Sequence, residues 1–194
     1  MNKIIAIDID LTIAQTDLGW LEWLKQSSVF FYEEEYLKDL KLRQVDYYLP
    51  KYFELCATVE PMDYWRENRT YPTVNLLSGC VEAVEKLYKE GNTIAFVSYC
   101  MGCSEQVKNK IRFLKYHFGD IVGTDLHFIA TKSKDLVRCD VLIDDRNSFL
   151  VSMPEDVQLI KINTPYTQDK KLDRQHLLVD NWSQIYEELG EKYV

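Results

Sequence analysis

Five short apolar runs, each rich in Ile, Val, Leu or Phe, recur along the chain. They cover Lys3–Ile9, Thr93–Ser98, Leu126–Ala130, Val141–Ile143 and Val157–Ile162. The first, fourth and fifth runs are almost unbroken by polar residues, which is typical of strands that are buried on both faces of a parallel sheet. The pattern therefore predicts a parallel sheet in the interior of the molecule.

Helical patterns lie between and after these runs. Gly79–Glu90, Ser104–Phe118 and Asn181–Tyr193 each place apolar residues three or four positions apart, on one face of a helix. Alternation of strands with helices predicts an α/β fold whose core is a doubly wound parallel sheet of the Rossmann-like type.

The segment between the first strand and the helix at Gly79 breaks this alternation. We find no convincing strand in it, and we expect helices over Leu18–Gln26, Glu33–Arg43, Val45–Cys56 and Pro61–Asn68. Residues 1–14 and 73–194 therefore form the predicted core, and residues 15–72 form a predicted helical insertion.

The insertion holds more than half of the aromatic residues of the chain. One interpretation is that a small helical unit needs large side chains to build any core of its own. A second is that a few of them line a pocket for a flat ligand. The candidates for such a pocket are Trp20, Trp23, Phe30, Phe31 and Trp65.

Composition narrows the class of protein. Hydrophobic residues make up 46% of the 194 positions, and no apolar run approaches the roughly 20 residues of a membrane-spanning helix. The net charge of −8 disfavours extended contact with nucleic acid or with an anionic membrane. The five cysteines are an odd number, which disfavours a disulfide framework, so we expect a cytoplasmic protein.

Polar residues directly follow four of the predicted strands. Asp8–Thr12 follow the first, Ser98–Tyr99 the second, Thr131–Lys134 the third and Asp144–Asp145 the fourth. Ligands of open α/β sheets bind at this edge, beyond the carboxyl ends of the strands. Four acids that meet there repel one another unless a divalent cation lies between them, and carboxylate oxygens suit Mg²⁺. The alternative is that the acids only cap helices and turns.

Together, Asp8-Ile9-Asp10-Leu11-Thr12, Ser98, Lys134 and Asp144-Asp145 resemble the four-motif signature of the haloacid dehalogenase-like (HAD) phosphohydrolases. The insertion straight after the first motif resembles the cap of that superfamily. Over about two thirds of the chain, the core is similar to the 5′(3′)-deoxyribonucleotidases. The segments that carry this second resemblance are Leu76–Val84, His117–Gly119, Lys134 with Asp140–Arg146, and Asn181–Ile185.

The resemblance implies Mg²⁺-dependent hydrolysis of a phosphomonoester in two steps. Asp8 is expected to attack phosphorus and form an aspartyl phosphate. Asp10 is expected to protonate the leaving oxygen and then to activate water. The expected metal ligands are Asp8, the backbone carbonyl of Asp10 and Asp145, with Asp144 orienting waters or Lys134.

The resemblance also implies a phosphate site made by Ser98, Tyr99 and Lys134. Lys132 is the rival for the last position, and the spacing to Asp140 favours Lys134. Two departures from the family lie beside the phosphate. Leu11 stands where the family usually has Gly, and Ser98-Tyr99-Cys100 stands where the family has Thr-Ser-Pro.

The leading hypothesis is a 5′-nucleotidase for (deoxy)nucleoside monophosphates. The alternatives are a phosphatase for a sugar phosphate or another small ester, one for the 3′-phosphate end of a nucleic acid, and a non-catalytic HAD-fold binding protein. The pair Cys100 and Cys103 also allows a redox motif or half a zinc site, although its place beside Ser98 favours a role in shaping the phosphate loop. We expect a small phosphate ester as partner, and the sequence leaves a homodimer open.

Overall fold

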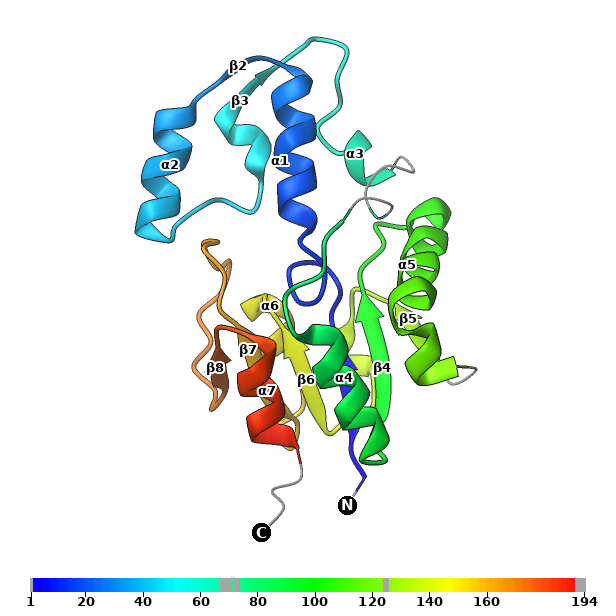
Figure 1. The fold of residues 1–194 in the computed structure, drawn as a ribbon. Helices are drawn as coiled ribbons and strands as arrows, with labels where there is room; N and C mark the ends of the chain where they lie inside the picture. Colours follow the sequence, from blue (N-terminus) through cyan, green and yellow to red (C-terminus); the bar gives the residue numbers. More distant parts are fainter. Residues whose placement is uncertain (1, 67–70, 72–73, 124–125, 191–194) are drawn as a thin grey trace.

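Six parallel strands form the central sheet of the computed structural model, in the order β5-β4-β1-β6-β7-β8 (Figure 1). They are β1 (Ile4–Ile7), β4 (Thr93–Ser98), β5 (His127–Ala130), β6 (Val141–Asp144), β7 (Gln158–Ile162) and β8 (Leu177–Val179). The structure describes residues 2–66, 71, 74–123 and 126–190. The predicted parallel sheet is confirmed. The edge strand β8 was not predicted, because three residues are too few to show a hydrophobic period.

Both faces of the sheet are buried along the four inner strands β4, β1, β6 and β7, which explains their apolar runs. In the central strand β1, Ile5 and Ile7 belong to the core cluster on one face, whereas Ala6 belongs to the cluster on the other. All three side chains are at most 1% exposed. A strand covered on both sides leaves no position where a polar residue would meet water.

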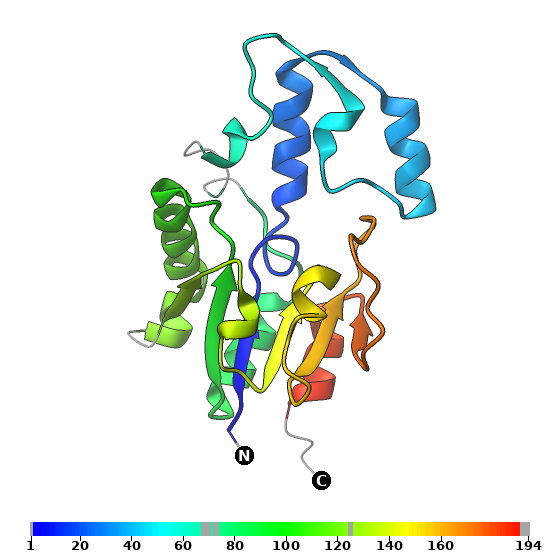
Figure 2. The ribbon, with the colours of Figure 1, turned by 180° about the vertical axis from the view of Figure 1, so that it is seen from behind.

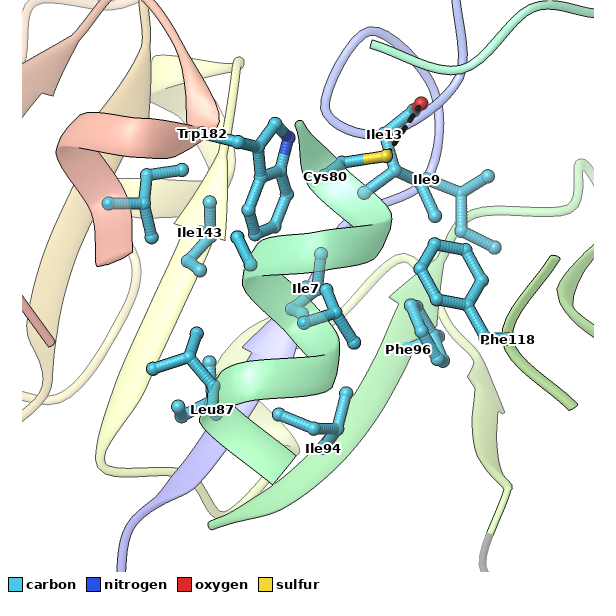
Figure 3. Close-up of a cluster of buried hydrophobic side chains, with 14 of the residues drawn as sticks. Ile7, Ile9, Ile13, Cys80, Leu87, Ile94, Phe96, Phe118, Ile143 and Trp182 are labelled. Carbon is cyan, nitrogen blue, oxygen red and sulfur yellow. Dashed lines mark hydrogen bonds between the residues drawn. The ribbon is translucent and has the colours of Figure 1, made fainter. Parts of the chain in front are cut away.

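Three helices cover one face of the sheet, namely α4 (Cys80–Lys89), α5 (Ser104–Val122) and α7 (Trp182–Leu189). Their apolar sides meet the sheet in one cluster that includes Phe96 and Trp182 (Figure 3). The opposite face carries the short helix α6 (Asn147–Leu150), the 3₁₀ helix η4 (Lys134–Leu136) and loops (Figure 2). The doubly wound core is therefore confirmed, with one thick and one thin helical layer.

The segment between β1 and α4 forms a unit of its own beyond the carboxyl ends of the strands (Figure 1). We call this unit the cap. Its elements are α1 (Thr16–Gln26), β2 (Ser28–Phe31), α2 (Glu33–Leu42), η1 (Leu49–Tyr52), β3 (Phe53–Leu55) and α3 (Asp63–Arg66). The predicted boundary between residues 72 and 73 lies outside the described residues, so the division at 15–72 stays a proposal.

The expectation of a purely helical cap is wrong. Strands β2 and β3 pair antiparallel, and the rings of Phe31 and Phe53 stack with their centroids 4.6 Å apart. The helix expected over Val45–Cys56 is instead η1 followed by β3. Pro50 lacks the N–H that a continuous α-helix would need there, and it is tolerated only in a first helical turn.

Two predicted helices extend past the described residues. The helix expected over Pro61–Asn68 is α3, and residues 67 and 68 lie outside the description. The same holds for residues 191–193 of the predicted last helix, whose described part is α7. No helix in the described ranges combines the length and apolarity needed to cross a membrane.

A tight turn connects β1 to the cap. The Leu11 N–H donates to the carbonyl of Ala14 at 2.8 Å, and Leu11 adopts a positive φ of 59°. The indole N–H of Trp182 donates to the carbonyl of Thr12 at 2.9 Å. Helix α7 thereby holds this turn against the core, close to the residues that end β1.

Candidate active site

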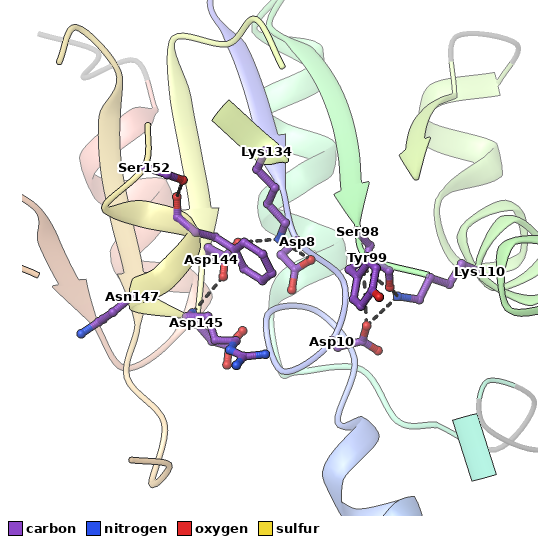
Figure 4. Close-up of polar contacts among 12 residues, drawn as sticks. Asp8, Asp10, Ser98, Tyr99, Lys110, Lys134, Asp144, Asp145, Asn147 and Ser152 are labelled. Carbon is purple, nitrogen blue, oxygen red and sulfur yellow. Dashed lines mark hydrogen bonds and ion pairs between the residues drawn. The ribbon is translucent and has the colours of Figure 1, made fainter. Parts of the chain in front are cut away.

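The carboxyl ends of β1, β4 and β6 bring the predicted polar residues to one edge of the sheet (Figure 4). Asp8 follows β1, Ser98 ends β4 and Asp144 ends β6. Because β1 pairs with both β4 and β6, its carboxylates lie between the other two sets. Asp145 and Lys134, which lies in η4, are buried with them.

Lys134 joins two of the acids. Its Nζ lies 2.7 Å from an oxygen of Asp8 and 2.5 Å from an oxygen of Asp144, and the side chain is 1% exposed. Burial acts to lower the pKa of Lys134, but the two carboxylates outweigh it and hold the pKa above its ordinary value. Lys134 is therefore a fixed positive charge beside Asp8.

Lys132, the rival lysine, does not share this position. Its Nζ lies over the ring of Tyr99, 5.8 Å from the centroid, and the residue is exposed. The two lysines thus occupy different places, one inside the acid cluster and one at the surface beside Tyr99.

The carboxylates of Asp8, Asp144 and Asp145 form a cluster fit for a metal ion. One oxygen from each lies within 4.8 Å of the others, and all three residues are buried. Burial raises the pKa of Asp8 to about 6; Lys134 opposes this rise, and the charges of Asp144 and Asp10 add to it. The pKa of Asp145 is raised for the same reasons, burial first and then Asp144 and Asp8. A divalent cation, for which hard carboxylate oxygens are suitable ligands, removes this repulsion.

Asp10 has a different set of partners. Its Oδ1 accepts a hydrogen bond from the Tyr71 hydroxyl at 2.5 Å, and its Oδ2 lies 2.6 Å from the Nζ of Lys110. The Ser98 hydroxyl is 3.4 Å from the same Oδ2. The Asp10 side chain therefore belongs to a second cluster beside the three-acid cluster (Figure 4).

Lys110 and Tyr71 were not predicted as site residues. The apolar spacing within Ser104–Phe118 predicts a buried face made by Val107, Ile111, Leu114 and Phe118. The first two are only half-buried, whereas Gln106, Asn109 and Lys110 are at most 4% exposed. The sequence did contain a signal for this site. Gln106, Asn109 and Lys110 interrupt the apolar stripe in the first turns of α5, and polar residues on the buried face of a helix need polar partners.

A cavity of about 340 Å³ lies between the cap and the strand ends. Asp8, Asp10 and Asp145 line it from the core. The aromatic residues that line it are Trp20, Tyr47, Tyr48, Trp65, Tyr99, Phe149 and Tyr166. A deep pocket with an acidic floor and aromatic walls is suited to a charged ligand that carries a flat or apolar group.

Only part of the aromatic prediction is confirmed. Trp20 and Trp65 line the cavity, with their rings edge-to-face at 5.4 Å. Trp23, Phe30 and Phe31 do not line it, so the prediction that they are pocket residues was wrong. Phe31 stacks inside the cap and Phe30 is 54% exposed, because alternate residues of β2 point to opposite faces.

The cap touches the acidic floor through Tyr47. Its hydroxyl donates to Oδ2 of Asp145 at 2.7 Å, and its ring stacks on that of Tyr166 at 5.0 Å. The neighbouring residue Val45 exchanges backbone hydrogen bonds with the segment around Tyr166. The cap therefore contacts the three-acid cluster of Asp8, Asp144 and Asp145.

Two buried polar atoms on the cavity wall have no hydrogen-bond partner among the described residues. They are Oγ1 of Thr16 and Oε1 of Gln106, in residues 1% and 3% exposed. A buried polar atom without a partner is costly. Both atoms are themselves shielded from the open space of the cavity, so they are a local cost of the cavity wall.

The pair Cys100 and Cys103 forms a turn between β4 and α5, with the Cys103 N–H donating to the Cys100 carbonyl at 2.8 Å. Both thiols are free, as are those of the other three cysteines. The turn leads from Ser98 into the helix that carries Lys110.

Residues 2–190 match the sequence profile of the family described as 5′ nucleotidase, deoxy (pyrimidine), cytosolic type C protein. The chain belongs to this family. It is accordingly a phosphohydrolase of the HAD type, and the predicted resemblance and the predicted enzyme class are confirmed. The type C 5′-nucleotidase profile spans the cap as well as the core.

Relatives of this type C 5′-nucleotidase family member cover nearly the whole chain. The 5′(3′)-deoxyribonucleotidases of Bacillus subtilis (strain 168) and of Bacillus phage SPbeta are each 22% identical over 190 residues, which is 97% of this chain and 99% of theirs.

Solved structures share the fold. A HAD family hydrolase from Deinococcus radiodurans R1, with bound phosphate and sodium, superposes with a TM-score of 0.60 at 14% identity. That match covers 97% of this chain and 95% of the other. CbbY from Rhodobacter sphaeroides in complex with phosphate gives a TM-score of 0.57 at 13% identity, over 95% of this chain and 96% of the other.

Proposed function

We propose that this phosphohydrolase is a Mg²⁺-dependent 5′-nucleotidase that cleaves (deoxy)nucleoside monophosphates through an aspartyl phosphate. One observation carries the proposal: two acids two residues apart each pair with a buried lysine, but only Asp8 belongs to the three-acid cluster. Asp8 shares Lys134 and the three-acid cluster, whereas Asp10 lies outside that cluster and contacts Lys110 and Tyr71. Two carboxyl groups in different surroundings can take the two roles of nucleophile and proton donor.

In the first step, an oxygen of Asp8 attacks phosphorus and the bond from phosphorus to the ester oxygen breaks. Asp10 gives its proton to that ester oxygen, which leaves as an alcohol. In the second step, a water attacks the aspartyl phosphate and passes a proton to Asp10. The bond between phosphorus and the Asp8 oxygen then breaks, which releases inorganic phosphate and restores both acids.

Ser98, Tyr99 and Lys134 are the proposed phosphate ligands. Lys134 uses two of its three N–H donors on Asp8 and Asp144, and its third side faces the ring of Phe149 at 4.4 Å. A phosphate oxygen is a much stronger partner for an ammonium than a ring is. Ser98, the last residue of β4, and Tyr99 line the cavity together with Asp8 and Asp10, where a phosphate oxygen would lie.

The proposed Mg²⁺ ligands are Asp8, the backbone carbonyl of Asp10 and Asp145, with Asp144 orienting waters or Lys134. When bound, Mg²⁺ screens the attacking carboxylate from the phosphate dianion and so allows the two anions to meet. The raised pKa values of Asp8 and Asp145 support a cation here, because an uncompensated acid cluster holds protons that the nucleophile must lose.

The cavity walls support a nucleotide as substrate. The core residues recognise a phosphate and its ester oxygen, so they cannot distinguish one monoester from another. The aromatic wall offers stacking for a base. The names of the two Bacillus relatives agree with this class of substrate. The five free thiols support the cytoplasm as the place of action.

A phosphate-release screen tests the proposal. The panel contains nucleoside 5′- and 3′-monophosphates, ribose 5-phosphate, other sugar phosphates and an oligonucleotide with a 3′-phosphate, each with Mg²⁺ and with excess chelator. We expect nucleoside monophosphates to exceed ribose 5-phosphate in kcat/KM by at least about ten-fold, the low end of the contribution of base stacking. Chelation should abolish turnover and Mg²⁺ should restore it.

The Asp8→Asn protein is the control, because it keeps the shape and loses the nucleophile. Its turnover should fall to background while its melting temperature shows that it is folded. Equal cleavage of ribose 5-phosphate and nucleotides would reject the nucleotidase but not the phosphatase. Turnover by folded Asp8→Asn would reject the aspartyl-phosphate mechanism.

A further inference from the structure

Lys110 is a buried cation in the middle of the active site. Its side chain is fully buried on α5, one of the least favourable places for an ammonium unless every donor is paired. Each of its three donors has an oxygen partner. They are Oδ2 of Asp10 at 2.6 Å, the Ser98 hydroxyl at 2.6 Å and the carbonyl of Tyr99 at 3.0 Å.

This pairing distinguishes Lys110 from Lys134. An ammonium has three N–H donors, and Lys110 has already given all three to protein oxygens. Lys134 has oxygen partners for two and meets only a ring on its third side. Lys110 therefore has no donor left for a phosphate oxygen, so its function concerns the groups that it already contacts.

Those contacts converge on the orientation of Asp10. Lys110, on α5, donates to Oδ2 of Asp10, and the hydroxyl of Tyr71, which comes late in the segment between β1 and α4, donates to Oδ1. The ammonium also lies 5.7 Å from the centre of the Tyr71 ring, so the three side chains form a closed triangle. Oδ2 of Asp10 accepts from both Lys110 and Ser98, whereas Oδ1 accepts from Tyr71 and keeps a second lone pair. Asp10 lines the cavity, where a proton can pass from Oδ1 to a substrate.

We propose that Lys110 is a positioning residue that, together with Tyr71, fixes the Asp10 carboxyl at the angle needed to protonate the leaving oxygen. The inference rests on the proposed function, in which Asp10 is the proton donor. A carboxyl on a turn, with no partners, would rotate freely about its side-chain bonds. Small errors in the placement of a proton donor are costly, because proton transfer requires hydrogen-bond contact in the transition state.

The dependence of rate on the leaving group isolates this role. A nucleoside leaves as an alkoxide and needs a proton, whereas nitrophenolate leaves from p-nitrophenyl phosphate without one. For both substrates kcat/KM reports steps up to the release of the alcohol. For Lys110→Met we expect kcat/KM to fall about 10²-fold or more with a nucleoside 5′-monophosphate, on the scale of general-acid catalysis. With p-nitrophenyl phosphate we expect a fall of less than about ten-fold.

Three further variants frame the experiment. Asp10→Asn is the reference and should show the same dependence on the leaving group. Tyr71→Phe removes one hydrogen bond and should show the same pattern at smaller size, which keeps the test open if Lys110→Met does not fold. Lys108→Met is the matched control, because Lys108 lies on the same helix, is exposed and pairs only with Glu105 among the described residues. It should leave both substrates unchanged.

The outcomes separate the two proposals. If Asp10→Asn affects both substrates equally, Asp10 is not the proton donor, and the mechanism and this inference both fail. If Asp10→Asn depends on the leaving group and Lys110→Met does not, only the inference fails. Equal losses in Lys110→Met together with weaker inhibition by inorganic phosphate would make Lys110 a phosphate ligand instead, and equal losses with unchanged inhibition would make it merely structural.

Discussion

Leu11 occupies a backbone conformation that most side chains avoid. Its φ of 59° lies in the left-handed region, where a Cβ costs roughly 1–2 kcal/mol and which Gly adopts freely. This is the position where the related deoxyribonucleotidases usually have Gly, and the turn geometry explains that preference. The side chain contacts the aromatic cluster of the cap, so apolar contact offsets the strain.

The strain at Leu11 predicts an inverted order of stability. Leu11→Ala loses the contact and keeps the strain, whereas Leu11→Gly loses both. The free energy of unfolding of Leu11→Gly should therefore exceed that of Leu11→Ala by about 1 kcal/mol. At Leu18, which is 54% exposed in α1, the order should be the usual one, with Ala more stable by about 1 kcal/mol. Urea unfolding of the four proteins checks this, and a less stable Leu11→Gly would refute it.

The two lysines before β6 give a second prediction at this scale. Lys134→Ala removes the charge that joins Asp8 and Asp144, so kcat should fall by about 10²-fold or more, as for other groups that stabilise transition-state charge. Lys132→Ala should change kcat little, because Lys132 only lies over the Tyr99 ring. Steady-state kinetics on any accepted phosphate ester checks this prediction. A larger loss of kcat in Lys132→Ala than in Lys134→Ala would contradict the assignment of Lys134.

At the scale of the element, the cap divides its aromatic residues between its own core and the cavity. Trp65 of α3 lines the cavity, whereas Phe30 of β2 points to solvent. We expect Trp65→Ala to reduce the kcat/KM ratio of nucleoside monophosphate to ribose 5-phosphate by about five- to ten-fold, from lost stacking. Phe30→Ala should leave the ratio unchanged. A smaller fraction of folded protein lowers both kcat/KM values equally and so leaves their ratio unchanged. If the ratio for Trp65→Ala equals that of the unchanged protein, Trp65 does not contact the base.

The same scale shows what could be predicted from the sequence. Strands β1 and β6 lie in unbroken, buried apolar runs, and acids directly after them must lie at the sheet edge, so Asp8 and Asp145 followed from local pattern. Strand β2 is partly exposed and β8 has only three residues, so neither forms a buried apolar run that the sequence could reveal. Lys110 was missed because a helix face was placed by its apolar residues alone. The Tyr71 contact joins residues 61 positions apart, and no local pattern reports such a pairing.

For the whole molecule, four carboxylates near one edge make stability depend on pH and on metal. The folded pKa of Asp8 is about 6, above its ordinary 3.8, so its contribution favours the fold at low pH and is lost as pH rises through about 6. A cation must displace those protons, so metal binding weakens below that pH. Mg²⁺ should therefore raise the melting temperature more at about pH 7.5 than at about pH 5.

Thermal unfolding with Mg²⁺ and with chelator, at both pH values, checks this prediction. Saturation to about 100 times Kd adds roughly 2.7 kcal/mol of stability. Asp145→Asn, which removes one ligand of the cluster, should lose most of the Mg²⁺ effect at the higher pH. A shift of equal size at both pH values would show that Mg²⁺ binds elsewhere.

The central place of β1 has a consequence for synthesis on the ribosome. β1 emerges before any other strand, yet its two neighbours are β4 and β6, which follow much later in the chain. The cap is a continuous segment, and all but Tyr166 of its cluster of buried side chains come from the cap itself, so it can begin to fold while Ile5 and Ile7 still have no sheet to enter. The nascent protein can therefore build its cap first. Its sheet is completed only after Asp145 and Trp182 have left the exit tunnel, and until then the apolar strand β1 is a natural target for chaperones.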